Sequence, residues 1–594
     1  MPVQTLSELF LAAVHNHPRG DLFTYRDADG KWQDISSEEA LRQVRALRFG
    51  LQSLGVKPGD KVAILSENRV EWAISDLAGL CAGAVTVPIY GTLLPDTIAY
   101  ILNDCQPVVV FVSTAEQAAK IHQIRDQVPS VKDLVAYDEV NVPGVMALAQ
   151  LMRIGQNLVE ANPPAPNEEA VPVDKDSPCS IIYTSGTTGN PKGVTLTHEN
   201  LVQNVLPSAE RAPVVPEDFC LEFLPLCHVF ERMLGYLYMY KSVTKAYCSV
   251  YHVGDLIATI KPTVFASVPR IYEKVYDKVV EKVNSAPAVR RALFNWALGA
   301  GRKAYPARLA GQQGGGISHA IADKLVLSKV REALGGRVKY CISGGAPLPL
   351  FVNEFFQSIG IRILEGYGLT ETSPVIAVNG MDGGMTRLGT VGKPISNVEV
   401  KIAEDGELCV RGPSVMKGYW NLPEKTAEVF DADGFFLTGD IAELDGDGFV
   451  RITDRKKDII VTAGGKNIAP QPIEAELKRS PLVDNAVIIG DRRPYLVVML
   501  SPNTEELENW AKAQGIEFSS TEEITRHPKA AEAFAKVVET TNDGLARYEQ
   551  IKKHVVLPLM LSIDDGTLTP TLKVKRRVVE KQYTDLIEGM YEGT

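Results

Sequence analysis

Residues 183–193 read YTSGTTGNPKG, a loop rich in glycines and hydroxyls between two apolar stretches. The run IIYTS at 181–185 predicts a strand before the loop, and the alternation VTLTH at 194–198 predicts a second strand after it. Glycines let backbone N–H groups approach an anion closely, and Lys192 adds a positive charge. The loop is therefore typical of a phosphate cradle, although its residues also suit a plain surface turn.

The loop does not have the Walker pattern of nucleotide triphosphatases. Gly186 and Lys192 have the Walker spacing, but Pro191 replaces the second glycine and Gly193 replaces the Mg²⁺-binding hydroxyl. A Walker loop also opens a helix, whereas this loop leads into a predicted strand. A Walker ATPase or a kinase is therefore the weakest of the interpretations.

The sequence around the loop predicts an α/β fold. Short apolar runs alternate with helical patterns at 61–66, 84–90, 107–113, 181–185, 223–226, 264–268 and 338–344. This alternation predicts mostly parallel sheets with flanking helices. Ligands of such folds bind beyond the carboxyl ends of strands, where the loop at 183–193 and the stretch SGGAPLP at 343–349 are expected to lie.

The length of 594 residues is too great for a single core, so we expect several domains. The Pro-rich segment at 162–178 suggests a linker, and Asp-Gly turns after residue 395 predict hairpins of a small β-barrel-like subdomain. The expected parts are an N-terminal α/β subdomain at 1–170, a second α/β subdomain at 171–395 with a helical insertion at 286–336, a β-rich subdomain at 396–455, and a small mobile α+β C-terminal domain at 456–594.

Composition limits the partners and the compartment. The net charge of -11 argues against a nucleic-acid-binding surface. The eight cysteines are scattered without zinc-ligand spacing, which favours a reducing, cytoplasmic compartment. The first twenty residues have the pattern of an amphipathic helix and not of a signal peptide, and no apolar run is long enough to span a membrane. Peripheral contact with the inner face of a membrane and the oligomeric state stay open.

Four further stretches carry groups suited to chemistry. They are EGYGLTETSP at 365–374, FFLTGD at 435–440, RITDRKKDIIVTAGGKN at 451–467 and GTLTPTLKVKRR at 566–577. Each alone has a plain structural explanation: Tyr367 can pack, Asp440 can close a turn, and the basic residues at 573–577 can form a solvated surface. Together with the opening loop they form a set with a definite order along the chain.

This set resembles the adenylate-forming superfamily, which includes acyl-CoA synthetases, the adenylation domains of peptide synthetases and firefly luciferase. YTSGTTGNPKG resembles the phosphate loop of that family and YGLTET its second signature, and TGD, DRKKD and LTPTLKVKR follow in the family's order. The resemblance covers nearly the whole chain. The stretch PLCHVFER at 225–232 and the insertion at 286–336 are most similar to the long-chain fatty acid branch.

The resemblance implies an ATP site with Mg²⁺. The residues implied for the β- and γ-phosphates are Thr184, Ser185, Gly186, Thr187, Thr188, Gly189 and Lys192. Those implied around adenine are Tyr367 with its neighbours Gly366 and Gly368, and Gly344, Gly345 and Ala346. Thr370 is implied at the α-phosphate, Glu371 at Mg²⁺, and Asp440 with Arg455 at the ribose.

The resemblance also implies a swinging C-terminal domain. Lys573 would bridge the α-phosphate and the substrate carboxylate, and Lys457 stands at the family's hinge position. Gly464 and Gly465 would line the path of the CoA arm, and His228 would line the acyl pocket.

The chemistry of acid activation needs groups of this kind. A carboxylate and ATP are both anionic, so cations must bring them together, and attack on the α-phosphate builds negative charge on its oxygens. Mg²⁺ at Glu371 and the ammonium of Lys573 would neutralise that charge, and one such preorganised group contributes roughly 3–4 kcal/mol in other enzymes.

The expected enzyme converts a fatty acid, ATP and CoA into acyl-CoA, AMP and pyrophosphate through an acyl-adenylate. One alternative is a ligase that passes the acyl group to the phosphopantetheine of a carrier protein; no carrier domain is evident in the sequence, which favours free CoA. A non-catalytic nucleotide-binding or scaffold protein is an alternative of another class, and the presence of Lys573 weighs against it.

Overall fold

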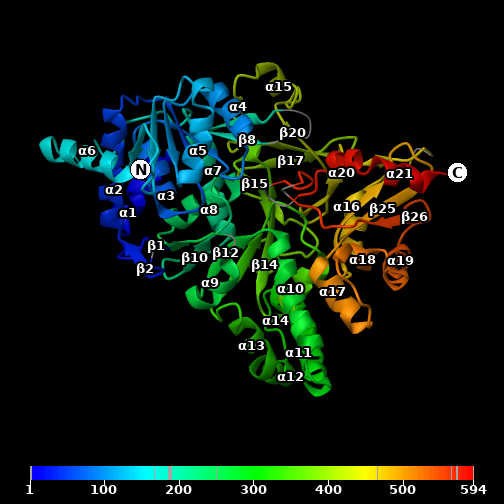
Figure 1. The fold of residues 1–594 in the computed structure, drawn as a ribbon. Coiled ribbons are helices and arrows are strands. Elements are labelled where there is room, and N and C mark those ends of the chain that lie inside the picture. Colours follow the sequence, from blue (N-terminus) through cyan, green and yellow to red (C-terminus); the bar gives the residue numbers. More distant parts are fainter. Residues whose placement is uncertain are drawn as a thin grey trace. The chain divides into compact units, whose positions relative to one another are not determined.

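A computed structural model describes residues 3–27, 29–165, 168–184, 190–249, 252–463, 466–562, 565–569 and 573–592. The chain divides into two compact units (Figure 1). The first comprises Met1–Lys401, Cys409–Thr438 and Asp445–Val450, and the second comprises Ile402–Leu408, Gly439–Leu444 and Arg451–Thr594. Ser185–Gly189, Gly464 and Gly465 lie outside the described residues.

An eight-stranded sheet of the first unit carries the phosphate-loop stretch. Its order is β19-β9-β8-β4-β3-β5-β6-β7, and the strands from β8 to β7 are parallel while β9 and β19 run antiparallel to their neighbours. The strands are β3 (Lys61–Leu65), β4 (Val85–Ile89), β5 (Val109–Val112), β6 (Asp133–Ala136), β7 (Val145–Ala147), β8 (Pro178–Thr184), β9 (Lys192–Thr197) and β19 (Gly418–Tyr419). The central strands are buried along almost their whole length because helices cover both faces.

A nine-stranded sheet completes the first unit, in the order β16-β15-β14-β13-β12-β10-β11-β1-β2. Its strands are β1 (Phe23–Arg26), β2 (Trp32–Ile35), β10 (Phe219–Glu222), β11 (Thr244–Tyr247), β12 (Val264–Ser267), β13 (Tyr340–Ser343), β14 (Arg362–Gly368), β15 (Val375–Val378) and β16 (Lys393–Pro394). The five strands from β11 to β14 are parallel neighbours, so their carboxyl ends share one edge.

Helices fill the connections of the first unit. They are α1 (Leu6–Asn16), α2 (Ser37–Ser53), α3 (Val70–Cys81), α4 (Pro95–Cys105), α5 (Ala115–Gln123), η1 (Arg125–Gln127), α6 (Leu148–Ala161), α7 (His198–Arg211), α8 (Val229–Tyr240), α9 (Val253–Ile260), α10 (Pro269–Asn284), α11 (Ala288–Leu309), α12 (Ile317–Ala322), η3 (Asp323–Leu327), α13 (Ser328–Glu332), α14 (Leu350–Ile359), η4 (Thr370–Thr372) and α15 (Pro423–Ala427). The N-terminal amphipathic stretch does form α1, which starts with a capping box of Thr5 and Glu8.

Four of the strands between residues 399 and 455 form a sheet in the order β17-β18-β20-β21. They are β17 (Glu399–Ile402), β18 (Glu407–Arg411), β20 (Phe436–Leu444) and β21 (Val450–Arg455). The Asp-Gly stretches form tight turns here, since Asp431 N–H donates to Phe435 O and Asp445 N–H donates to Phe449 O.

The second unit has a three-stranded sheet, β24-β25-β26, with a separate hydrophobic core on each face. Its elements are β22 (Ile460–Val461), β23 (Asn467–Ile468), α16 (Pro470–Leu477), β24 (Val483–Ile489), β25 (Leu496–Pro502), α17 (Thr504–Ala513), α18 (Thr521–Thr525), α19 (Pro528–Asn542), β26 (Ile551–Val556), α20 (Arg576–Gln582) and α21 (Thr584–Tyr591). Buried residues alternate between the two cores along β25, as the strand period requires.

The predicted α/β fold with large N-terminal sheets and a C-terminal domain is confirmed. One predicted strand is wrong: residues 223–226 lie outside any strand, and the strand is β10, which ends at Glu222. Pro225 explains the shift, because proline cannot donate to a sheet ladder. The domain boundaries at 170, 395 and 455 stay predictions.

Candidate functional site

The two ends of the phosphate-loop stretch are brought together by strand pairing. Thr184 ends β8 and Lys192 begins β9, and these two residues face each other in the antiparallel register. The stretch therefore closes a hairpin, and Ser185, Gly186, Thr187, Thr188 and Gly189 within it lie outside the described residues.

Tyr419 joins this hairpin to a carboxylate. It lies in β19, next to β9, and the ammonium of Lys192 is 4.8 Å from the centroid of its ring. Its phenol donates to Glu371 Oε1 over 3.0 Å. Burial and the Glu371 charge raise the pKa of Tyr419, so the phenol stays protonated and remains a donor. A cation, an aromatic ring and a carboxylate thus form a chain of contacts.

The loop that carries Thr370 and Glu371 is held from both sides. The Thr372 hydroxyl accepts from Leu369 N–H over 3.0 Å and donates to Pro374 O over 2.5 Å. Gly368 has no room for a side chain, because a Cβ there would lie 1.7 Å from Pro374 O. Both candidates, Thr370 and Glu371, remain partly exposed. The loop is therefore rigid where it presents them.

The candidate adenine residues follow two adjacent strands. β13 ends at Ser343, which pairs in parallel with Glu365 of β14. Gly344, Gly345 and Ala346 continue from β13, and Gly366, Tyr367 and Gly368 continue from that point of β14. Gly345 has a φ of 83°, a conformation that favours glycine. The structure therefore brings these two stretches to the same sheet edge.

Glu365 lies buried beneath that edge. Its Oε1 accepts from Asn353 Nδ2 over 2.8 Å, and only 7% of the residue is exposed. Burial raises the pKa of its carboxyl to about 7, although the Asn353 hydrogen bond lowers it. Sequence reasoning did not single out this glutamate.

His228 caps helix α8. Its Nδ1 accepts from Phe230 N–H over 3.2 Å, and its backbone carbonyl accepts from Arg232 N–H. Since Nδ1 is an acceptor, the neutral ring carries its proton on Nε2. The residue is half-buried. Its capping contact explains its position whether or not it also contacts the substrate.

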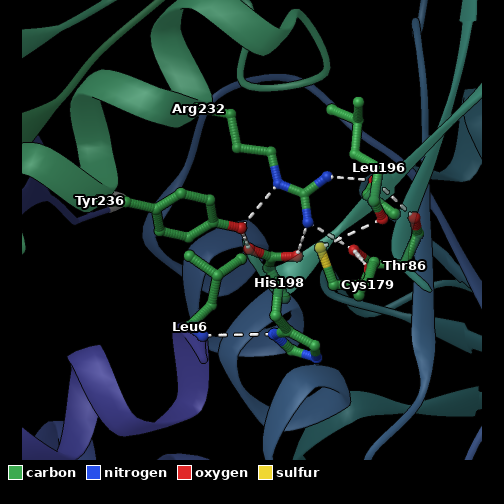
Figure 2. A network of polar contacts seen from close by, with 9 residues as sticks. Leu6, Thr86, Cys179, Leu196, His198, Arg232 and Tyr236 are labelled. Carbon is green, nitrogen blue, oxygen red and sulfur yellow. Dashed lines mark hydrogen bonds and ion pairs between the residues drawn. The ribbon is translucent and has the colours of Figure 1, made fainter. Parts of the chain in front are cut away.

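Four residues further along α8, Arg232 anchors a buried polar network (Figure 2). Its guanidinium donates to Asp76 over 2.5 Å, to Ser180 of β8 over 2.6 Å, to Tyr236 over 2.8 Å and to Thr86. Arg232 and Asp76 are almost fully buried. This network ties the helix that His228 caps to the strand that ends at Thr184.

A second group of candidates lies in the second unit. Asp440 is buried, and its Oδ1 pairs with Arg455 Nε over 3.2 Å. Burial around the ammonium and the nearby Arg455 charge lower the pKa of Lys573 to about 8, and Asp440 raises it. The Lys573 residue as a whole is exposed, and its N–H donates to Thr569 Oγ1 over 3.0 Å. The charges of Asp440 and Arg455 therefore both act on the Lys573 ammonium.

The TGD turn that carries Asp440 is braced by an ion pair. Gly439 N–H donates to Glu407 Oε1 over 2.8 Å, and Lys456 Nζ lies 2.7 Å from Glu407 Oε2. Lys456 also donates its backbone N–H to Gly439 O over 2.9 Å. Lys457, the candidate hinge residue, is exposed in the turn that follows β21.

The donor set fits Mg²⁺. This ion binds through one or two carboxylates together with substrate phosphates and water. Glu371 supplies one oriented carboxylate within reach of the Tyr419–Lys192 contact. Among the residues described, no group of three or more His, Cys, Asp or Glu side chains forms a separate metal site.

Two family models match the chain. The model described as AMP-binding enzyme matches residues 10–420, and that described as AMP-binding enzyme C-terminal domain matches residues 457–594. A protein of Mycobacterium bovis named long-chain-fatty-acid–CoA ligase FadD15 is 38% identical over 98% of this chain and 96% of its own length. The peroxisomal long chain acyl-CoA synthetase 7 of Arabidopsis thaliana is 32% identical over 99% of this chain and 86% of its own length.

Solved structures show the same fold. The adenylation domain of a carboxylate reductase from Mycobacterium chelonae superposes with a TM-score of 0.79 and 23% identity, covering 100% of this chain and 92% of that one. ATP-bound MatB from Rhodopseudomonas palustris superposes with a TM-score of 0.71 and 23% identity, covering 98% of this chain and 99% of that one.

Proposed function

Because this chain belongs to the AMP-binding enzyme family, we propose that it activates a long-chain fatty acid with ATP and transfers the acyl group to CoA. The full-length likeness to proteins named as long-chain-fatty-acid–CoA ligases supports this reaction. Within the chain, the contact of Tyr419 with both Glu371 and Lys192 is the observation that carries it. A phosphate-binding cation close to a Mg²⁺-binding carboxylate is suited to a nucleotide polyphosphate.

In the first half-reaction a carboxylate oxygen of the acid attacks the α-phosphorus, and the bond to pyrophosphate breaks. Lys192 and the hairpin from Thr184 to Gly189 hold the leaving pyrophosphate, and Thr370 contacts the α-phosphate. Mg²⁺ at Glu371 supplies neutralising charge when bound. The ammonium of Lys573 donates to the α-phosphate and carboxylate oxygens, where negative charge develops.

The nucleoside is held by three parts of the chain. Tyr367 stacks on adenine between Gly366 and Gly368, because stacking needs only a flat aromatic face. Gly344, Gly345 and Ala346 cover its other side. Asp440 accepts from the two ribose hydroxyls, and Arg455 contacts its carboxylate.

In the second half-reaction the CoA thiolate attacks the acyl carbonyl, and AMP leaves. His228 lines the acyl pocket near this carbonyl. Because its Nδ1 accepts from Phe230 N–H, the Nε2 proton is the one that the ring can donate. Gly464 and Gly465 line the path of the CoA arm. A rotation at Lys457 removes Lys573 from the active site and presents Gly464 and Gly465 there instead. The thiol then enters only after pyrophosphate has left.

The compartment is cytoplasmic in this proposal, with peripheral contact at the inner face of a membrane. All eight cysteines are free and buried, which suits a reducing compartment. Among the described residues, no helix has both the length and the apolar character needed to cross a membrane.

The test is incubation with ATP, Mg²⁺ and acids from acetate to oleate, with and without CoA, followed by mass spectrometry of AMP and acyl-CoA. We expect CoA-dependent turnover that is greatest with long acids. Adenylate without a CoA product would instead indicate transfer to a carrier-protein phosphopantetheine. ADP in place of AMP would contradict the assignment of the 183–193 hairpin.

A further inference from the structure

The helical insertion of the first unit presents an apolar stripe to solvent. Val289, Leu293 and Trp296 of α11 are 80%, 41% and 41% exposed, and their spacing of four and three residues sets them on one side of the helix. A neighbouring side of α11 packs against the protein. Phe294 and Gly301 are buried there, and a Cβ on Gly301 would lie 2.0 Å from Ser358 O of α14. The apolar stripe is therefore not the face that packs against the core.

A second stripe lies on the neighbouring helix. α12 and η3 contact α11, and α11 and α12 lie together in Figure 1. Ile317, Ile321 and Leu325 recur every four residues along α12 and η3 and are 83%, 47% and 48% exposed. Leu327 is buried on the protein side. The insertion thus exposes two apolar stripes while both helices keep a packed face.

These side chains are concentrated and not scattered. Sixteen large apolar side chains are exposed among the described residues, and six of them lie within residues 289–325. Isolated exposed apolar residues are ordinary on a protein surface, whereas a contiguous group marks an interaction surface.

The same segment is basic in an acidic protein. Residues 286–332 contain eight lysines and arginines but only two acids, although the whole chain has a net charge of -11. The exposed cations are Arg290, Arg291, Arg302, Lys303, Lys324 and Lys329. In the part of the chain that the structure describes, none of these six forms an ion pair. Their charge is therefore available to an anionic partner.

We propose that α11 and α12 dock on an anionic lipid bilayer, with Val289, Leu293 and Trp296 in the headgroup–acyl boundary and the exposed cations at lipid phosphates. An amphipathic helix with Trp and Leu on one face and Lys and Arg beside it is suited to this boundary. The indole of Trp296 matches the mixed polarity there. The inference rests on the proposed function, because long-chain fatty acids partition into membranes and docking places the enzyme at its substrate.

Sedimentation of the full chain with vesicles tests the proposal without any turnover. We expect the protein to bind phosphatidylglycerol vesicles more tightly than phosphatidylcholine vesicles, with Trp fluorescence shifting to the blue. The paired substitution Arg290→Gln and Arg291→Gln should weaken binding roughly ten- to thirty-fold, since each juxtamembrane cation contributes about five-fold. Leu293→Ser with Trp296→Ser should weaken it at least about ten-fold and remove the blue shift.

Leu94→Ser is the matched control. Leu94 is 72% exposed in the same unit but precedes α4, outside the insertion, so this variant should bind vesicles like the unaltered chain. Turnover of a short, water-soluble acid should be unchanged in every variant, which separates a failure of docking from a failure of the proposed function. Equal binding to both lipids, no binding, or unaltered binding by the two paired variants would overturn the proposal. A concentration-dependent dimer in light scattering that the Leu293/Trp296 variant abolishes would overturn it in favour of a second copy of this chain.

Discussion

The phenol of Tyr419 donates a hydrogen bond to Glu371 across a sequence separation of 48 residues. The same ring lies against the ammonium of Lys192. Tyr419 therefore orients the carboxylate proposed for Mg²⁺ and holds it close to the hairpin proposed for the phosphates. This double contact makes Tyr419 a positioning residue for both.

Replacing Tyr419 by Phe tests this role, because Phe keeps the ring over Lys192 and removes only the donor. A hydrogen bond to a charged group contributes about 1.5–3 kcal/mol, so we expect kcat/KM for ATP in adenylation to fall about 10- to 100-fold. The Mg²⁺ concentration for half-maximal rate should rise as well. Titration of Mg²⁺ in a pyrophosphate-release assay measures both.

Tyr305→Phe serves as the control for that substitution. It removes a similar Tyr–Glu hydrogen bond in the same unit, from Tyr305 of α11 to Glu354 of α14 over 3.4 Å. Its Mg²⁺ dependence should match that of the unaltered enzyme. An unchanged Mg²⁺ dependence in Tyr419→Phe would show that Tyr419 does not position Glu371.

Lys573→Ala should abolish adenylation but spare thioester formation from supplied acyl-adenylate. The loss in the first half-reaction should be about 10²- to 10³-fold, as for other preorganised donors. Quenched-flow assays of each half-reaction provide the measurement, and Arg577→Ala, an exposed cation of the same segment, provides the control. Equal losses in both half-reactions would refute the role of Lys573.

The pH profile gives a second view of Lys573. Its pKa is lowered to about 8, and only the protonated ammonium can neutralise the α-phosphate. Adenylation should therefore decline as the pH rises through about 8, while thioester formation from supplied adenylate should not decline at the same pH. A single common profile for both half-reactions would contradict this assignment.

Arg232→Met should destabilise the first unit strongly. It leaves the buried Asp76 carboxylate without its cation, and breaking a buried pair in this way costs about 3–5 kcal/mol. Denaturant unfolding measures the free energy, and adding Asp76→Asn should restore part of it. Arg42→Met removes an exposed ion pair to Glu39 and should change the free energy of unfolding by less than about 1 kcal/mol. Similar losses in the two single variants would contradict the importance of burial.

Glu365→Gln should stabilise the protein at alkaline pH. The folded-state pKa of Glu365 is about 7, above the ordinary value of 4.5, so its favourable contribution is complete below pH 4.5 and is lost as the pH rises through 7. Between pH 5 and pH 8 the variant should gain up to about 3 kcal/mol relative to the unaltered chain. Thermal unfolding across this range measures the difference, and a constant difference would show that Glu365 titrates normally.

Several features of the fold follow from local sequence. The apolar runs of β3, β4 and β5 were predicted within two residues of their ends, because buried parallel strands are apolar along their whole length. The strand predicted at 223–226 was wrong, since the apolar pattern continues past β10 into a proline-containing turn where the ladder ends. Apolar character alone does not reveal where a ladder stops.

By itself the sequence determined the fold class, because turn chemistry and strand periodicity are encoded within a few neighbouring residues. The order of its motifs and their resemblance to the adenylate-forming superfamily supplied the candidate groups. Tertiary structure alone decided that Thr184 faces Lys192, that Tyr419 contacts Glu371, and that Arg232 meets Asp76. These contacts depend on which strands become neighbours in a sheet, and that choice is made by burial of surfaces far apart in the chain. Local sequence patterns do not indicate which strands will become neighbours.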